Sequence, residues 1–240
     1  MRYDLFQRKY VLSAMATRRS IVLPKPPEVK LMASIVFALY PGFTQLDFTG
    51  PYEVFCRLPG AKVTVASLEG GELRTEHGLT FSNMVRLKDV ADCTLLCVPG
   101  GIDQSAAMCE PFFSQLNRLA KHATYITSVC NGSLLLAAAG LLKGKRSACH
   151  WAVRPLLEKY GAIPDPARVV RDGNIITGGG VTAGIDFALT VAAEIAGPTV
   201  AQTIQLLLEY APAPPFNAGS PETAPPEVML NCRRWLSERA

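Results

Sequence analysis

Apolar runs and amphipathic segments alternate along most of the chain. Runs of aliphatic and β-branched residues predict buried strands, and apolar residues recurring every three or four positions predict helices. The strands that we expect are 34–39, 61–67, 93–98, 125–129, 169–172 and 174–177, with a hairpin or edge strand at 79–85. The helices that we expect are 46–56, 111–121, 133–140, 154–160, 184–195 and 200–210. This alternation predicts a flavodoxin-like, doubly wound α/β fold, a parallel sheet with helices on both faces.

Three candidate functional segments follow strands directly. Asp47 comes after the first strand, Gly100-Gly101 after the strand that ends in VPGG, and Cys130 after strand 125–129. Ligands bind at the carboxyl ends of strands in sheets of this kind. We therefore expect these segments to converge on one site.

Cys130 is the most informative of these residues. Asn131-Gly132 provides a turn, and an apolar helix is predicted from Ser133 onward. A strand, a sharp turn and a helix hold a side chain at a helix N-terminus, as in a nucleophile elbow. Partial positive charge at that terminus favours the thiolate, so we predict Cys130 as a nucleophile. The alternative, a small buried side chain, is our interpretation of the other six cysteines.

Composition changes along the chain and indicates three regions. Residues 1–30 hold seven of the 24 Lys and Arg residues and only two acids, and we interpret them as a basic extension outside the fold. It is either a targeting peptide or, as we prefer, a segment upstream of the true start at Met32. Residues 31–210 form the α/β domain, which is near neutral and shows no nucleic-acid footprint. Residues 211–240 form a proline-rich arm and a short helix.

Cysteine usage and hydropathy indicate in which kind of cellular compartment the protein is expected. The seven cysteines form no CxxC pair and no zinc-type cluster, so we expect no metal and a reducing, cytoplasmic compartment. No apolar run reaches the ~18–20 residues that span a membrane. A long proline-rich arm without its own core needs a surface to pack on, which predicts a homodimer.

Several motifs in order resemble a known family. The chain resembles the ThiJ/PfpI family of the glutamine-amidotransferase-like superfamily over about residues 33–227, and the nearest subgroup is isonitrile hydratase. The resemblance is carried by PGFTQLDFTGP at 41–51, VPGG at 98–101, SVCNGS at 128–133, ACHW at 148–151 and the proline-rich arm.

The resemblance implies Cys130 as nucleophile and Asp47 as its acidic partner. A carboxyl in an apolar crevice beside a thiolate should have a raised pKa and could act as a general acid. The alternative for Asp47 is an acid at a helix N-terminus. The amides of Gly100 and Gly101 could stabilise developing negative charge, or the segment could be a tight turn only.

Two further residues belong to the candidate site. Asn131 stands where the family's hydratases carry threonine, and it offers an amide but no hydroxyl. It is therefore either a catalytic and substrate-binding residue or part of an Asn-Gly turn. His150 is an auxiliary candidate that could relay protons, the alternative being a partly buried histidine beside Trp151.

Together these features predict a cofactor-free hydratase that converts a small isonitrile to an N-formamide. One alternative is a glyoxalase or deglycase acting on small aldehydes, although such relatives carry glutamate in place of Asp47 and histidine in place of Asn131. Another is a redox sensor in which Cys130 is oxidised without turnover. The chain lacks the His-x-Glu pair of amidotransferases, and only about 14 residues follow the arm, too few for a helix-turn-helix.

Overall fold

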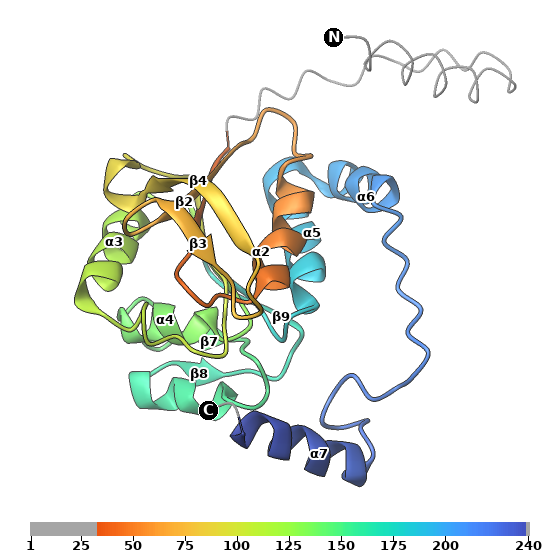
Figure 1. Cartoon of the computed structure of the whole chain (residues 1–240). Helices are drawn as coiled ribbons and strands as arrows, with labels where there is room; N and C mark the ends of the chain where they lie inside the picture. The colour runs from red at the N-terminus through yellow and green to blue at the C-terminus, as the bar shows by residue number, and fades with distance from the viewer. Residues whose placement is uncertain (1–32, 239–240) are drawn as a thin grey trace, which may run out of the picture.

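The computed structural model describes residues 33–238, so the basic extension predicted at 1–30 lies outside the described residues. The described part is built around an eight-stranded sheet in the order β3-β4-β2-β1-β5-β6-β10-β9 (Figure 1). Its strands are β1 (Ser34–Ala38), β2 (Lys62–Ser67), β3 (Gly71–Arg74), β4 (Thr80–Arg86), β5 (Leu95–Val98), β6 (Tyr125–Val129), β9 (Val169–Asp172) and β10 (Ile175–Gly178).

The pairing within the sheet is mostly parallel. Strands β4, β2, β1, β5, β6 and β10 run parallel to their neighbours, whereas β3 with β4 and β9 with β10 are antiparallel at the two edges. The predicted strands are therefore confirmed, and β3 was missed. The strand expected from residue 93 begins at Leu95, because the pairing with β1 starts with Ile35 opposite Leu95 and Cys93 lies before it.

Helices cover both faces of the sheet, as predicted. In Figure 1, α2 and α5 lie on one side of the sheet and α3 and α4 on the other. The helices are α2 (Gln45–Phe55), α3 (Glu110–Ala120), α4 (Gly132–Ala138), α5 (Ala183–Ala196), α6 (Pro198–Leu207) and α7 (Pro226–Ser237), with 3-10 helices η1 (Leu87–Asp89) and η2 (Arg154–Tyr160) and a two-stranded sheet of β7 (Arg146–Ser147) and β8 (Ile163–Pro164).

Two helix predictions need correction. The segment 154–160 is a short 3-10 helix, which stops at Gly161 in the left-handed conformation (φ +74°). Helix α6 ends at Leu207, three residues earlier than expected, and Glu209 has a left-handed φ of +50°. A left-handed residue cannot continue a right-handed helix.

The core fixes the position of α2, and with it that of Asp47. Phe37 of β1 packs edge-on against Phe48 of α2, with ring centroids 5.1 Å apart, and both side chains are buried. On the other side of α2, Gly184 of α5 approaches Pro51 so closely that an added Cβ would lie 3.2 Å from the proline ring. Helix α2 is thus held between the sheet and α5.

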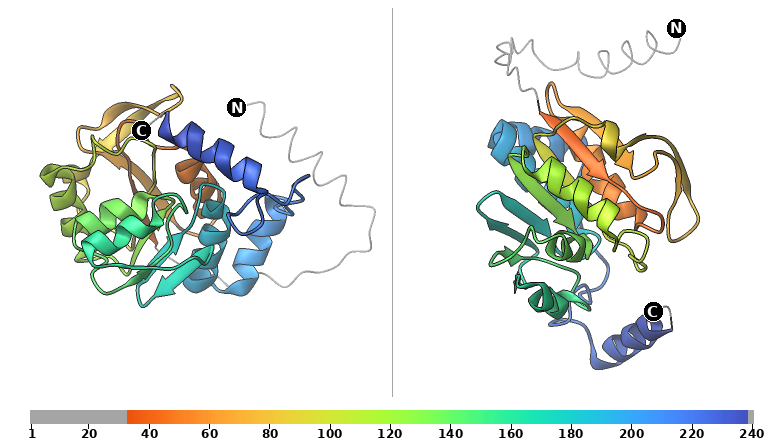
Figure 2. Two further views of the ribbon diagram at one scale, coloured as in Figure 1. Left: turned by 90° about the horizontal axis from the view of Figure 1, so that it is seen from below. Right: turned by 90° about the vertical axis from the view of Figure 1, so that its left-hand side faces the viewer.

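After α6 the chain leaves the domain and returns to it. Residues 211–225 contain no helix or strand, and they lead to α7. The two views of Figure 2, like Figure 1, show α7 at the end of the molecule where β8 and η2 lie. Nothing in α7 is buried.

Candidate active site

The carboxyl ends of β1, β5 and β6 bring the candidate segments together, as the sequence predicts. These strands are neighbours in the sheet and run parallel. The Gly100 amide after β5 donates a hydrogen bond of 2.9 Å to Oδ2 of Asp47, which follows β1. The Gly101 amide donates to Oδ1 of Asn131, which follows β6, also at 2.9 Å.

Cys130 occupies a constrained turn between β6 and α4. Its φ is +58°, in the left-handed region that few non-glycine residues adopt. Its amide donates to the carbonyl oxygens of Gly178 and Gly179, at 3.1 and 2.7 Å. Two residues on, where α4 begins, Gly132 must be glycine, because a Cβ there would lie 2.2 Å from the Val98 backbone oxygen. Strained conformations of this kind concentrate at functional sites.

Asp47 is fully buried in the first turn of α2. Its Oδ2 accepts the Gly100 hydrogen bond, whereas its Oδ1 is buried without a hydrogen-bond partner in the described structure. Burial raises the pKa of Asp47 to about 7, and the Gly100 amide and the Cys130 thiol only partly oppose this. The carboxyl bonds to another loop and not to an N–H of α2, so it does not cap the helix.

The direction of the Cys130 pKa corrects a sequence-based expectation. The helix N-terminus was expected to favour the thiolate, but burial raises the pKa of Cys130 well above its ordinary value, and the charge of Asp47 raises it further. The Asn131 amide opposes these effects without reversing them. The carboxyl and the thiol therefore titrate as an interacting pair, in which the ionisation of one group opposes that of the other.

Asn131 holds the loop that follows β5. Its Nδ2 donates to the Gly101 oxygen at 2.8 Å, and its Oδ1 accepts the Gly101 amide. The amides of Gly100 and Gly101 are thus both engaged by side chains of the site. Their expected oxyanion role stays a prediction, one that requires these hydrogen bonds to be exchanged for substrate. The catalytic role expected of Asn131 likewise stays a prediction.

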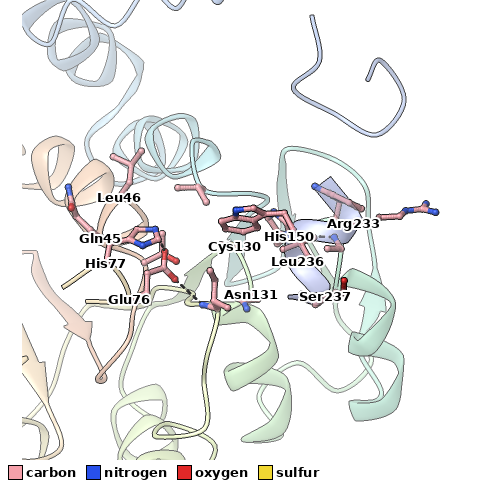
Figure 3. A pocket seen from close by; sticks show the side chains of 17 residues that line it. Gln45, Leu46, Glu76, His77, Cys130, Asn131, His150, Arg233, Leu236 and Ser237 are labelled. Carbon is pink, nitrogen blue, oxygen red and sulfur yellow. Dashed lines mark hydrogen bonds and ion pairs between the residues drawn. The ribbon is translucent and has the colours of Figure 1, made fainter. Parts of the chain in front are cut away.

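A cavity of about 920 Å³ opens above Cys130 and Asn131. Figure 3 shows Leu46, Glu76 and His77 on one side of these two residues and His150 on the other. His150 is half-buried, and burial lowers the pKa of its imidazole. A neutral ring in the wall of the cavity is compatible with the auxiliary role expected from the sequence.

Comparison with known proteins agrees with this architecture. Residues 33–194 match the model of the DJ-1/PfpI family. The chain belongs to the DJ-1/PfpI family.

Three relatives show how far the likeness extends. Isonitrile hydratase from Pseudomonas putida is 48% identical over 201 residues, which cover 83% of this chain and 88% of that protein. Protein dj-1beta from Drosophila melanogaster is 31% identical, over 74% of this chain and 98% of its own length. The crystal structure of a ThiJ/PfpI family protein from Pseudomonas syringae superposes with a TM-score of 0.86 at 40% identity, covering 92% of this chain and 94% of the other.

Sequence reasoning missed three residues that hold the loops of the candidate site in place. Buried Gln104 donates through Nε2 to the backbone carbonyl oxygen of Asn131 at 2.9 Å and to the Tyr40 hydroxyl at 3.2 Å. The Tyr40 hydroxyl in turn donates to the Pro99 oxygen at 3.2 Å. Glu76 accepts the Ile102 amide at 3.0 Å. These residues carried no signal in the sequence. Tyr40 was interpreted as the end of an apolar strand, and Gln104 and Glu76 lie in irregular segments that contain no motif.

Two kinds of feature are absent from residues 33–238. No helix in that range combines the length and the apolar character that crossing a membrane requires. The same range also contains no group of three or more His, Cys, Asp or Glu side chains that could hold a metal ion.

Replacing Gly100 by alanine should distort the site. The new Cβ would lie 2.1 Å from Oδ1 of Asn131 and 2.8 Å from Oδ2 of Asp47, so both side chains must move. We expect a loss of about 1–3 kcal/mol in the free energy of unfolding, typical of overpacking. Any turnover that depends on the placement of Asp47 and Asn131 should fall by roughly 10²-fold, because small displacements of reacting groups are costly. Thermal unfolding and kinetics check this, and Gly219→Ala is the control because nothing lies within 4 Å of its Cβ. Wild-type turnover in Gly100→Ala would contradict the prediction.

Proposed function

We propose that this chain hydrates isonitriles to N-formamides, with Cys130 as nucleophile and Asp47 as proton donor. The observation that carries the proposal is the buried, unpartnered Oδ1 of Asp47 in a carboxyl that interacts with the Cys130 thiol. An oxygen left without a partner in the protein is available to exchange a proton with substrate. The 48% identity to an isonitrile hydratase supports this choice of reaction.

The first step begins when the Cys130 thiol and the Asp47 carboxyl hold a single acidic proton between them. In the reactive form, Cys130 is the thiolate and Asp47 is the neutral acid. The sulfur attacks the terminal carbon of the isonitrile and forms a C–S bond. Asp47 gives its proton to the same carbon and becomes the carboxylate. The product is a thioimidate, R–N=CH–S–Cys130, and covalent catalysis of this kind divides one difficult step into two.

The second step consumes one water molecule. The Asp47 carboxylate takes a proton from water while the hydroxide adds to the thioimidate carbon, and Asp47 then passes that proton to nitrogen. The carboxylate next takes the proton of the new hydroxyl group as the C–S bond breaks. This releases R–NH–CHO and restores both the Cys130 thiolate and neutral Asp47, so the sum is isonitrile plus water to N-formamide.

Other residues position this pair. The Gly100 amide holds Oδ2 of Asp47, which leaves Oδ1 as the proton-exchanging oxygen. The Asn131 side chain holds the loop that carries Gly100 and Gly101. The resemblance implies a threonine at this position in the best-known hydratases, and in the proposed site the Asn131 amide takes the place of that hydroxyl. His150 lies in the cavity wall, where a neutral imidazole can accept or pass on a proton.

A parallel assay tests the proposal against its alternatives. Purified protein is offered cyclohexyl isocyanide and methylglyoxal separately, and formamide and lactate are measured. Formamide alone supports the hydratase, and lactate alone supports an aldehyde-directed enzyme. No turnover of either, together with oxidation of Cys130 in dilute peroxide, overturns the hydratase in favour of a redox sensor.

We also propose that the protein is a homodimer. Three of its most exposed apolar side chains, Leu206, Leu207 and Phe216, lie at the end of α6 and in the arm, with exposures of 69–80%. A second copy of the chain would cover them, as an oligomer interface does. Sedimentation equilibrium at micromolar concentration should give twice the chain mass, and Leu206→Glu with Leu207→Glu should halve it. A wild-type monomer would contradict this.

A further inference from the structure

The outer wall of the cavity above Cys130 comes from the far end of the chain. Arg233, Trp235, Leu236 and Ser237 of α7 line the same cavity as Cys130, about 100 residues away in sequence. Figure 3 shows Arg233, Leu236 and Ser237 on the same side of Cys130 as His150, opposite Leu46 and Glu76. Helix α7 thus stands across the cavity from the N-terminus of α2.

The chemistry of this outer part differs from that of the floor. The floor offers the thiol of Cys130 and the amide of Asn131, whereas the outer wall is mainly apolar. Both tryptophans of the chain line the cavity, Trp151 after β7 and Trp235 on α7. The remaining apolar lining comes from Leu46, Ile102, Ala152, Val153, Val181 and Leu236.

The size and charge of the cavity further restrict the kind of ligand that it can bind. A volume of about 920 Å³ far exceeds the reacting isonitrile group and lies in the range of sites that enclose drug-sized molecules. Glu76 and Arg233 stand on opposite sides of the cavity, so the charges of these two lining residues cancel in sum. Large, rigid aromatic side chains instead favour apolar groups.

We propose that α7 forms an outer subsite of the substrate pocket, in which Trp235, Leu236 and Trp151 enclose a bulky apolar substituent on the isonitrile nitrogen. This inference rests on the proposed hydratase function, because it places the reacting carbon at Cys130. Trp235 is a specificity-determining residue, and it acts on substrate binding and not on the proton transfers.

Kinetics with two substrates of different size test the subsite. Trp235→Ala should lower kcat/KM for cyclohexyl isocyanide by roughly tenfold or more, mainly through KM, as expected when a hydrophobic pocket loses contacts. Methyl isocyanide has no bulky substituent to place in this subsite, so its kcat/KM should stay within about twofold. Trp235→Phe should recover most of the loss. Leu230→Ala is the matched control, because Leu230 is an exposed apolar residue of α7 that does not line the cavity. Equal losses for both substrates, or no loss for either, would overturn the proposal.

A binding measurement separates the subsite from the reaction. N-cyclohexylformamide and N-methylformamide are titrated by calorimetry into wild type, Trp235→Ala and Leu230→Ala. Only N-cyclohexylformamide should bind roughly tenfold more weakly to Trp235→Ala. This result without isonitrile turnover would reject the hydratase and keep the apolar subsite. Turnover together with unchanged N-cyclohexylformamide binding in Trp235→Ala would reject the subsite and keep the hydratase.

Discussion

Replacing Cys130 by alanine should abolish isonitrile turnover, with a loss of roughly 10⁴-fold or more, as when the nucleophile of a covalent mechanism is removed. Alanine cannot form the C–S bond, and no other cysteine lines the cavity. The fold should survive, because the substitution removes a single sulfur from a site that already opens onto the cavity. Formamide production from cyclohexyl isocyanide measures the effect, and thermal unfolding verifies the fold.

A neighbouring thiol provides the control for this variant. Cys149 is buried and lies close enough to Cys130 to influence its pKa, yet it does not line the cavity. Cys149→Ala should retain turnover within a few-fold. Turnover in Cys130→Ala at more than a few per cent of the wild-type rate would exclude covalent catalysis at this residue.

Replacing Asp47 by asparagine should lower kcat by roughly 10²–10⁴-fold, the usual range for the loss of a general acid or base. Asparagine keeps the size of the side chain and can still accept the Gly100 hydrogen bond, but it carries no acidic proton. Substrate binding should change little, because asparagine has almost the same size as aspartate and the residues that line the cavity are unchanged. Asp89→Asn is the control, an exposed carboxylate paired with Arg86 on the surface. Full hydratase activity in Asp47→Asn would exclude Asp47 as the proton donor.

The pH dependence of turnover in wild type and in Asp47→Asn is a more specific test of the role of Asp47. Burial raises the pKa of Asp47 to about 7, so the pair loses its first proton near that pH, and the singly protonated pair contains the reactive form. Wild-type kcat/KM should therefore rise as the pH passes through about 7. In Asp47→Asn only Cys130 can ionise, and burial keeps the pKa of its thiol above the ordinary value, so the rising limb should move to higher pH.

Stability should change with pH in the opposite sense to activity. The folded protein holds the Asp47 proton up to about pH 7, whereas an unfolded chain releases it near the ordinary value of 3.8. Stability is therefore fully present below the lower pKa and is lost progressively until the pH exceeds the higher one. At about 1.4 kcal/mol for each pH unit, the full difference is about 4 kcal/mol. Asp47→Asn should unfold at a higher temperature than wild type at pH 8, and this advantage should vanish near pH 4.

The sequence predicts the part of this site that depends on strand ends. Alternating apolar strands and helices define a parallel sheet, and residues that follow neighbouring strands must meet at one edge, which is why Asp47, Gly100 and Cys130 converge as expected. The pKa direction at Cys130 was mispredicted because burial depends on packing from several elements, whereas the sequence displays only the local helix terminus. The place of Trp235 in the cavity wall could not be predicted either, since residues 211–225 carry no periodic pattern that would indicate where α7 docks.

The extended segment 211–225 sets how firmly the outer wall of the cavity is held. Because this segment ties α7 to the domain, the docking of α7 is an intramolecular event, which raises the effective local concentration of the helix above that of a free peptide. Weak contacts then suffice to keep the helix in place, which agrees with the absence of buried residues in α7. Because α7 contributes no buried residue, displacing it would leave the core packing intact, and under the proposed function this one helix offers a route by which substrate enters and product leaves.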